Sequence, residues 1–211
     1  MDPRVTAAFE LQLDLWRSAL AAGADRVGWK IGFNTSAAQQ QAGIVEPVVG
    51  HLTSATTIKY GAHLSLAGFT RPMVEPEVAI EVGDDGDAVA LAAAIEVVDV
   101  NAPFSDVEAI VAANIFHRAA LLGDFRPNYP PPRKVAVLVN GHPTQETDAV
   151  QFDATETIAL VASTLAEAGE SLEPGDKIIA GSLTPPVEVS PDDIVGVQLD
   201  NLGMVQLIFK P

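Results

Sequence analysis

The glutamates of one short segment have the side-chain type and the spacing that favour binding of a metal ion. In residues 74–82, VEPEVAIEV, the two-residue period of a strand places Glu75, Glu77 and Glu81 on one face and apolar side chains on the other. Carboxylates about 5 Å apart repel by roughly 3 kcal/mol per pair at an effective dielectric constant of about 20. A partly buried cluster therefore recruits a cation or holds a proton, and hard oxygen ligands suit Mg²⁺, Mn²⁺ or Ca²⁺.

Glu96 extends this cluster from a second segment. It lies inside the strongly apolar run 92–99, AAAIEVVD, where a buried carboxylate needs a partner. We therefore predict that Glu75, Glu77 and Glu96 hold one divalent cation, with water and substrate in the remaining positions. The alternative is a solvated acidic strand face.

Lys30 is the candidate catalytic cation. Residues 27–32, VGWKIG, alternate as a strand does. Lys30 therefore shares one face of the strand with two glycines, and Trp29 lies on the other face. The alternative for Lys30 is a surface lysine on an edge strand.

The elements that must position these residues follow from periodicity and capping signals. Apolar residues at helical spacing predict a helix from about residue 6 to 22, and Gly, Asp and Pro punctuation between residues 50 and 100 predicts successive strands. The capping box Ser105–Glu108 predicts a helix that continues through Leu121 to about Gly123. On that helix Ile110, Asn114, His117 and Leu121 would share one face.

The C-terminal third contains a loop, a hairpin, a helix and further strands. Residues 127–132 include three consecutive prolines and predict a loop, and Asn140-Gly141 after the strand 135–139 predicts a hairpin. The capping box Asp153–Glu156 opens a helix closed by Gly169. Strands are expected near 177–180, 194–199 and 204–209.

This order of elements favours an α+β fold. It lacks the regular strand–helix alternation of a doubly wound sheet, which makes a mixed β-sandwich or roll with a few flanking helices the better prediction. A chain of 211 residues is long enough for one core, so we expect a single domain over 1–211 with an N-terminal helical arm at 1–24.

Composition limits the classes of partner. The formal net charge of -16 opposes binding to nucleic acid or to anionic membranes. The sequence lacks an uninterrupted apolar run long enough to span a membrane, and its first residues are charged where a signal peptide is apolar, so a cytoplasmic location is the default expectation. The absence of cysteine excludes disulfides, thiolate metal sites and a cysteine nucleophile.

An ordered set of motifs runs from about residue 25 to the C-terminus. The motifs are GWKIG at 28–32, QQQAG at 39–43, VEPEVAI at 74–80, AIEVVD at 94–99, AGSLT at 180–184 and PDD at 191–193. By this set the sequence resembles the fumarylacetoacetate hydrolase superfamily, in its 2-hydroxypenta-2,4-dienoate hydratase and 4-oxalocrotonate decarboxylase branch. The resemblance implies the superfamily's β-sandwich or roll and an assembly of at least two subunits.

The resemblance also implies a mechanism. Glu75, Glu77 and Glu96 would occupy the metal-ligand positions and Lys30 the position of the active-site lysine. A 2-oxo acid would chelate the cation, which stabilises the enolate that forms at the oxo group. Lys30 would supply positive charge or a proton, and its flanking glycines would let substrate approach the backbone.

Six further residues are candidates for catalysis or substrate binding, and all but Asn114 have a structural alternative. His117 would carry a proton, or would tie its helix to a neighbouring loop. Asn114 matches a position of the family, and Arg118 would pair with a substrate carboxylate or with a nearby acid. In the late motif, Ser182, Leu183 and Thr184 would contact substrate, or would form an ordinary strand end.

Two departures from the family leave the exact reaction open. Val48 stands where the family has an acidic residue, and Phe116 and His117 stand where small or hydroxyl residues are expected. The leading hypothesis is a lyase that hydrates a small 2-oxo acid or its dienol form. The alternatives are a decarboxylase, a carbon–carbon hydrolase of an acylpyruvate, or a catalytically silent binding or assembly protein.

Overall fold

The computed structural model describes residues 2–148 and 150–211. Its helices are α1 (Pro3–Ala21), α2 (Ser36–Ala42), α3 (Val107–Ala112) and α4 (Ala154–Glu167). Its strands are β1 (Arg26–Gly32), β2 (Val48–Thr53), β3 (Thr57–Ile58), β4 (His63–Ser65), β5 (Pro72–Val82), β6 (Ala88–Asp99), β7 (His117–Leu122), β8 (Arg126–Pro127), β9 (Val135–Val139), β10 (His142–Thr147), β11 (Lys177–Ile179), β12 (Val187–Glu188), β13 (Ile194–Leu199) and β14 (Gly203–Lys210).

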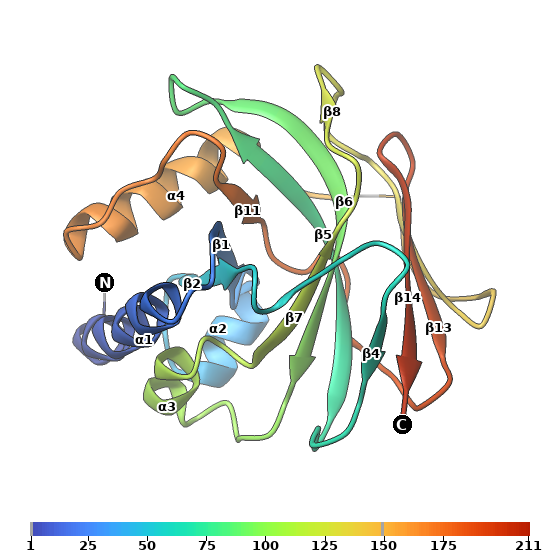
Figure 1. The fold of residues 1–211 in the computed structure, drawn as a ribbon, viewed down its shortest axis with the longest axis horizontal. Coiled ribbons are helices and arrows are strands. Elements are labelled where there is room, and N and C mark those ends of the chain that lie inside the picture. Colours follow the sequence, from blue (N-terminus) through green and yellow to red (C-terminus); the bar gives the residue numbers. More distant parts are fainter. Residues whose placement is uncertain (1, 149) are drawn as a thin grey trace.

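Two sheets organise the molecule. In the described residues the larger sheet has the order β2-β1-β11-β5-β6-β7-β3, with β12 on β5 and β8 on β6, and the smaller has the order β10-β9-β13-β14-β4. The helices lie on one side of the long strands β5 and β6, and the smaller sheet lies on the other (Figure 1). This is the α+β architecture that the order of elements predicts. None of the helices in the described residues is long and apolar enough to cross a membrane.

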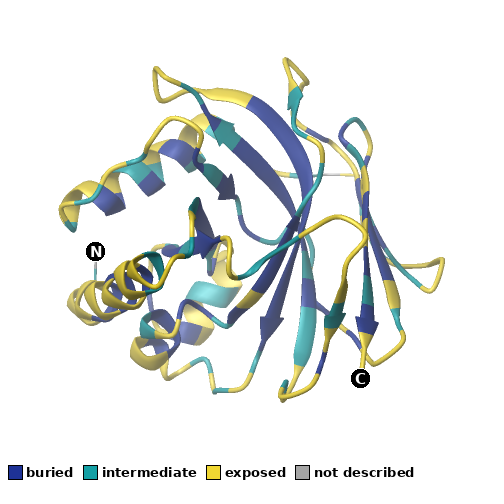
Figure 2. Cartoon of the chain, viewed as in Figure 1, coloured by how far each residue is buried: buried dark blue, intermediate teal, exposed yellow. Residues whose placement is uncertain are grey.

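Strands β5 and β6 form the centre of the fold. They pair antiparallel along nearly their whole length, with Glu75 directly opposite Glu96. Every residue of β6 from 90 to 99 is buried, and Figure 2 shows the buried colour along much of the central strands. Because the central strands are covered on both faces, a charged side chain there is held in the protein interior.

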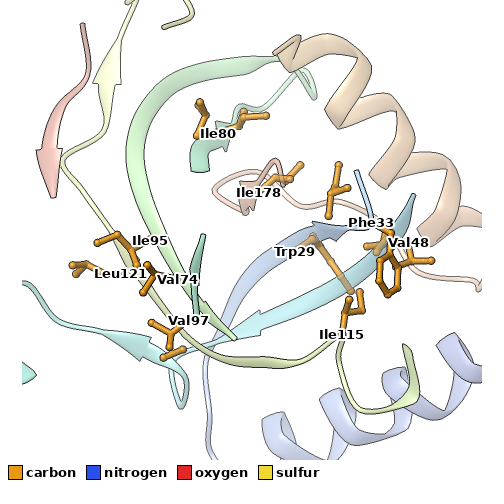
Figure 3. Close-up of a cluster of buried hydrophobic side chains, with 14 of the residues drawn as sticks. Trp29, Phe33, Val48, Val74, Ile80, Ile95, Val97, Ile115, Leu121 and Ile178 are labelled. Atoms are coloured by element: carbon orange, nitrogen blue, oxygen red, sulfur yellow. The ribbon is translucent and has the colours of Figure 1, made fainter. Parts of the chain in front are cut away.

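The two faces of this sheet are packed differently. Larger side chains fill one face, where Figure 3 shows Ile95, Val97 and Leu121 in one group and Trp29, Phe33 and Ile115 in another. The other face carries small residues, in a cluster made of Leu52, Ala79, Ala92, Ala94, Ala120 and Ile179. Ala79 follows Glu77 by two residues, so it lies on the same face of β5. The carboxylates therefore lie on the same face as these small residues.

Helix α1 covers the end of the sheet that carries Lys30. Asp2 caps the helix by accepting from the backbone of Arg4, so α1 begins at Pro3, earlier than the predicted start near residue 6. Trp16 of α1 packs on Trp29 of β1 with ring centroids 5.1 Å apart. This contact fixes the helix on the outer face of the strand whose inner face carries the lysine.

Several predictions from local sequence are confirmed. The Asp153 carboxylate accepts from the backbone of Glu156 at 3.0 Å and opens α4. Asn140 and Gly141 both have positive φ, at 53° and 81°, as a tight hairpin turn requires between β9 and β10. Strand β13 has the predicted limits, 194–199.

The prediction of one long helix from residue 105 to about 123 is wrong. Helix α3 ends at Ala112 and has Asp106, without a side-chain cap, at its start. Three left-handed residues follow, and His117 begins strand β7. Strand β7 pairs with β6, so backbone hydrogen bonds to the central sheet replace those of the helix. The predicted common helix face through Asn114, His117 and Leu121 therefore does not exist.

Candidate active site

The three predicted glutamates converge. Glu75 and Glu77 come from β5 and Glu96 from β6, and each offers a carboxylate oxygen within 4.8 Å of the others. Glu77 and Glu96 are fully buried, and Glu75 is half-buried at the wall of a cavity. The alternative of a solvated acidic face is wrong. Glu81, on the same face of β5, forms an ion pair with Lys177 at 2.7 Å instead.

The hydrogen bonds of these carboxylates are incomplete. Glu77 accepts from the backbone N–H of Gly181 at 2.7 Å through Oε2, and within residues 2–148 and 150–211 its Oε1 has no hydrogen-bond partner. Glu96 receives both of its contacts at Oε1, and its Oε2 has no partner in the same described ranges. Buried polar atoms are normally satisfied. Two unpartnered carboxylate oxygens in one buried cluster therefore fit a divalent cation.

The pKa values of the three acids are displaced in different directions. Burial, followed by the charge of Glu96, raises the pKa of Glu75 to about 7. Burial and the charges of the other two glutamates raise the pKa of Glu77 well above its ordinary value. Burial also disfavours the charged form of Glu96, but Lys30 and His117 outweigh it and hold this pKa below its ordinary value. Of the three, Glu96 is thus the carboxyl whose charged form the surroundings favour.

Lys30 lies beside the cluster in the interior. Its side chain is 1% exposed, and its ammonium contacts Glu96 Oε1 at 2.6 Å and donates to the carbonyl of Ile115 at 3.1 Å. Strand β1 has neighbours on both sides, so the alternative of a surface lysine on an edge strand is wrong. An ammonium has three N–H donors, and these two contacts leave one of them.

The glycines around Lys30 serve packing within the protein. A Cβ on Gly28 would lie 2.0 Å from the backbone oxygen of Lys177, and one on Gly32 would lie 2.6 Å from Ile115. A Cβ on Gly50 would lie 2.8 Å from the Lys30 stem. The interpretation that both flanking glycines let substrate approach the backbone is therefore wrong for Gly28, where protein atoms fill the space, whereas Gly32 lines the cavity.

His117 holds a metal-ligand candidate in place. Its Nδ1 lies 2.7 Å from Glu96 Oε1, and its Nε2 lies 3.0 Å from Thr56 Oγ1. Burial lowers the pKa of His117, although Glu96 opposes this effect. A neutral ring that donates from Nδ1 and accepts from the Thr56 hydroxyl satisfies both contacts. His117 thus lies behind Glu96, in contact with its carboxylate, and it does not line the cavity.

A strained turn connects α3 to β7. Asn114, Ile115 and Phe116 have φ values of 63°, 56° and 61°. Left-handed backbone costs roughly 1–3 kcal/mol for each such residue and is most unusual for a β-branched one such as Ile115. The turn brings the Ile115 carbonyl to Lys30. The Asn114 amide exchanges two hydrogen bonds with the backbone of His51, at 2.9 and 3.0 Å.

A cavity of about 650 Å³ opens beside the carboxylates. Its polar lining includes Lys30, Glu75, Arg71, Asn34 and Gln41. Most of the remaining wall is apolar, from Ile31, Phe33, Ala37, Ala38, Met73, Val98, Val100, Phe104, Ile115, Phe116, Leu183, Pro185 and Pro186. Phe104 contacts both Phe33 and Phe116 with centroid distances of 5.8 Å. The cavity therefore suits a small molecule with a polar head at the glutamates and a hydrocarbon body.

The late motif forms part of this cavity. Ser182, Leu183 and Thr184 all line it, and the loop is fixed to β5 by the bond from Leu183 N to the carbonyl of Pro76 at 2.8 Å. The Ser182 hydroxyl donates to the Thr184 carbonyl at 2.7 Å, which leaves its oxygen free to accept.

Other predicted residues lie elsewhere. Asn114 and Arg118 are outside the cavity lining, with the Arg118 guanidinium 3.6 Å from Asp99 and 4.4 Å from the centre of the Phe69 ring. Val48 is buried in β2, also outside the lining. Sequence reasoning missed Arg71 and Met73, although the alternation that identifies Glu75 and Glu77 would extend to both if followed towards the N-terminus.

Comparisons with known proteins give consistent relatives. No family model matches the sequence. A 4-oxalocrotonate decarboxylase of a Pseudomonas species is 28% identical over 218 residues, covering 94% of this chain and 84% of its own. The TodF product hydratase of Pseudomonas putida F1 is 28% identical over 234 residues, covering 96% and 83%. A 2-hydroxyhexa-2,4-dienoate hydratase of Comamonas testosteroni is 27% identical over 228 residues, covering 97% and 86%.

Solved structures show the same fold. The 4-oxalocrotonate decarboxylase of Pseudomonas putida G7, complexed with magnesium and adipate, superposes with a TM-score of 0.85 at 23% identity, covering 97% of this chain and 86% of its own. The fumarylpyruvate hydrolase of Pseudomonas aeruginosa, in complex with Mn²⁺ and pyruvate, gives a TM-score of 0.66 at 16% identity, covering 88% and 90%. The chain is therefore similar to hydratases and decarboxylases of the fumarylacetoacetate hydrolase superfamily, and it shares the fold of the solved structures.

Proposed function

We propose that this protein is a divalent-cation-dependent lyase that acts on a small 2-oxo acid or its dienol form, as a hydratase does. The observation that carries the proposal is the pair of unpartnered buried oxygens on Glu77 and Glu96, beside the Lys30 ammonium and next to a largely apolar cavity. Glu75, Glu77 and Glu96 are the proposed ligands of Mg²⁺ or Mn²⁺, with Ca²⁺ as a further candidate.

The relatives support this proposal. They bear the names of 2-keto-4-pentenoate hydratase, hydroxydienoate hydratase and 4-oxalocrotonate decarboxylase. Solved structures of the same fold contain magnesium, calcium or manganese. A three-carboxylate site in which two oxygens lack donors is chemically suited to these ions.

The chain's own residues would supply positive charge, orient the substrate and keep water away from its hydrocarbon part. A bound cation would act as a Lewis acid that polarises the oxo group of the substrate. Lys30 is fixed by Glu96 and the Ile115 carbonyl, so its remaining N–H can donate to an oxygen that gains negative charge. The Ser182 oxygen can accept from a substrate hydroxyl, and the aromatic wall around Phe104 keeps bulk water from the hydrocarbon part.

Decarboxylation is the second candidate, and one observation favours it. Among the described residues that line the cavity, the titratable ones are Lys30, Arg71 and Glu75. Val48 replaces the acid that the family carries, and it is buried outside the lining. Hydration, like hydrolysis of an acylpyruvate, requires a group that activates water. Loss of carbon dioxide requires an electron sink, but it does not require a group that activates water.

The first prediction concerns the cation. Wild-type protein is expected to gain thermal stability with Mg²⁺ or Mn²⁺, and Glu77→Gln is expected to lose most of that gain because the amide is a weaker ligand. Glu81→Gln is the matched control, since Glu81 lies on the same strand face but pairs with Lys177. Differential scanning calorimetry measures the shifts. Equal shifts in the two variants would contradict the site.

The second prediction concerns pH. The pKa of Glu75 rises from 4.5 to about 7 on folding, so the metal-free folded protein binds more protons than the unfolded chain between these values. This group's contribution to stability is therefore present at low pH and is lost as pH rises towards and through about 7. Bound Mg²⁺ should offset the loss, because it takes the place of the proton.

Thermal unfolding at pH 5 and pH 8, with a chelator or with Mg²⁺, measures this effect. Glu75→Gln is the control, because the amide does not titrate and should flatten the pH dependence of the metal-free protein. A metal-free pH dependence that is unchanged in Glu75→Gln would show that this carboxyl is not responsible.

The third prediction concerns Lys30. Lys30→Met is expected to reduce turnover of 2-hydroxypenta-2,4-dienoate, or enolisation of a simpler 2-oxo acid, by roughly a hundredfold or more. The ammonium is paired with the buried Glu96, so the variant should also be less stable without Mg²⁺. Lys177→Met, on the neighbouring strand β11, is the control and should retain activity. Full activity in folded, Mg²⁺-loaded Lys30→Met would refute the role.

The fourth prediction concerns assembly. Helix α1 exposes two apolar side chains, Leu11 at 60% and Leu15 at 56%, and exposed apolar surface of this kind supports a homo-oligomer of at least two subunits. Light scattering should give at least twice the 22.1 kDa mass of the chain at micromolar concentration. Leu11→Ser should weaken the assembly if α1 forms the contact. A monomer at that concentration would remove the proposal.

A further inference from the structure

The cavity has a cation at the end away from the metal-ligand candidates. Arg71 immediately precedes β5 and lines the cavity together with Met73 and Glu75. These residues alternate along one edge of the cavity, so Arg71 and Glu75 lie about 13 Å apart along the strand, at about 3.3 Å per residue. The cavity therefore has a second cation, Arg71, at the end away from Glu75 and Lys30.

The position of Arg71 is fixed by its backbone. The carboxylate of Asp99, at the end of β6, accepts from the N–H of Thr70 at 3.0 Å and from that of Arg71 at 2.7 Å. The carbonyl of Arg71 accepts from Val100 at 3.0 Å. These bonds hold the start of the strand through the backbone of Arg71, and none of them involves its side chain.

The Arg71 guanidinium has no partner among the residues that the structure describes. In the described residues it forms neither an ion pair nor a side-chain hydrogen bond, although the chain has 28 acidic and 12 basic residues. The nearby Arg118 is paired with Asp99. Glu188 lies across from Met73 on β12, but no ion pair joins it to Arg71. An unpaired guanidinium at a cavity wall is a ready site for a carboxylate.

The wall between the two ends is hydrocarbon. Met73 and Val98 are paired across β5 and β6, two residue pairs beyond Glu75 and Glu96. Val100, Phe104 and Phe116 complete this part of the lining. A ligand that reaches from the glutamates to Arg71 must therefore have an apolar middle.

We propose that Arg71 binds a carboxylate at the far end of the substrate, so that the site prefers 2-oxo diacids with a hydrocarbon linker over 2-oxo acids with an apolar tail. The inference rests on the proposed function, because it assumes that the 2-oxo acid head lies at Glu75, Glu77 and Glu96. Arg71 is thus the residue that determines specificity for the substrate's tail. The competing outcome is an apolar tail that the same walls would accept.

Binding of a matched pair of ligands tests the inference. 2-Oxoadipate and 2-oxohexanoate have chains of equal length and the same head, and differ by the distal carboxylate. Calorimetric titration of Mg²⁺-loaded wild-type protein should give at least about tenfold tighter binding of 2-oxoadipate, the scale of a charge-assisted hydrogen bond. Arg71→Gln should bring the two affinities to within about twofold by weakening the diacid alone.

Two further variants sharpen the test. Arg71→Lys keeps the charge but loses the forked geometry, so it should retain part of the preference. Arg133→Gln removes an exposed arginine outside the cavity lining and should leave the preference unchanged. Thermal melts of each variant show that the fold is intact.

Each other outcome counts against the inference in a distinct way. One such outcome is that wild-type protein binds 2-oxohexanoate as tightly as 2-oxoadipate, and another is that Arg71→Gln weakens binding of both ligands equally. In either case Arg71 does not determine specificity for the tail, and the proposed function stands. If the Mg²⁺-loaded protein binds neither ligand and does not bind pyruvate, the head site is wrong, and both proposals are overturned.

Discussion

The structure depends on a buried carboxylate that must keep its charge. Glu96 lies in the middle of a strand that is covered on both faces, where an isolated charge is very costly. One of its oxygens contacts both Lys30 and His117, and the other has no partner in the protein. The protein thus stabilises half of the carboxylate and leaves the other half for a ligand.

This arrangement explains features far from the glutamates in sequence. Strand β1 must lie inside the sheet to bring Lys30 beneath Glu96, and Gly28 and Gly50 allow its neighbours to approach closely enough. The left-handed turn at 114–116 places the Ile115 carbonyl on the ammonium and starts β7 with His117 facing the carboxylate. Strain in that turn is offset by the hydrogen bonds it makes possible.

The groups that line the cavity are also held in place by the protein before a ligand binds. Glu75 and Lys30 lie at one end, much of the remaining wall is aromatic or aliphatic, and the loop 181–184 is fixed to β5 by hydrogen bonds to the Glu77 carboxylate and the Pro76 carbonyl. Groups that are positioned before the substrate arrives need not reorganise as charge develops, which is the main source of electrostatic catalysis. The differing pKa values of Glu75, Glu77 and Glu96 follow from their different shares of neighbouring positive charge.

The sequence by itself determined those features of the fold that depend on residues close together along the chain. Strand alternation placed Glu75 and Glu77 on one face, the capping box identified the start of α4, and Asn140-Gly141 identified the hairpin. Only the tertiary structure decided that residues 117–122 form a strand, because their hydrogen bonds go to β6 and their apolar pattern fits a helix as well. The partners of Lys30 and His117 and the free guanidinium of Arg71 were decided in the same way, since they depend on which distant strands lie side by side.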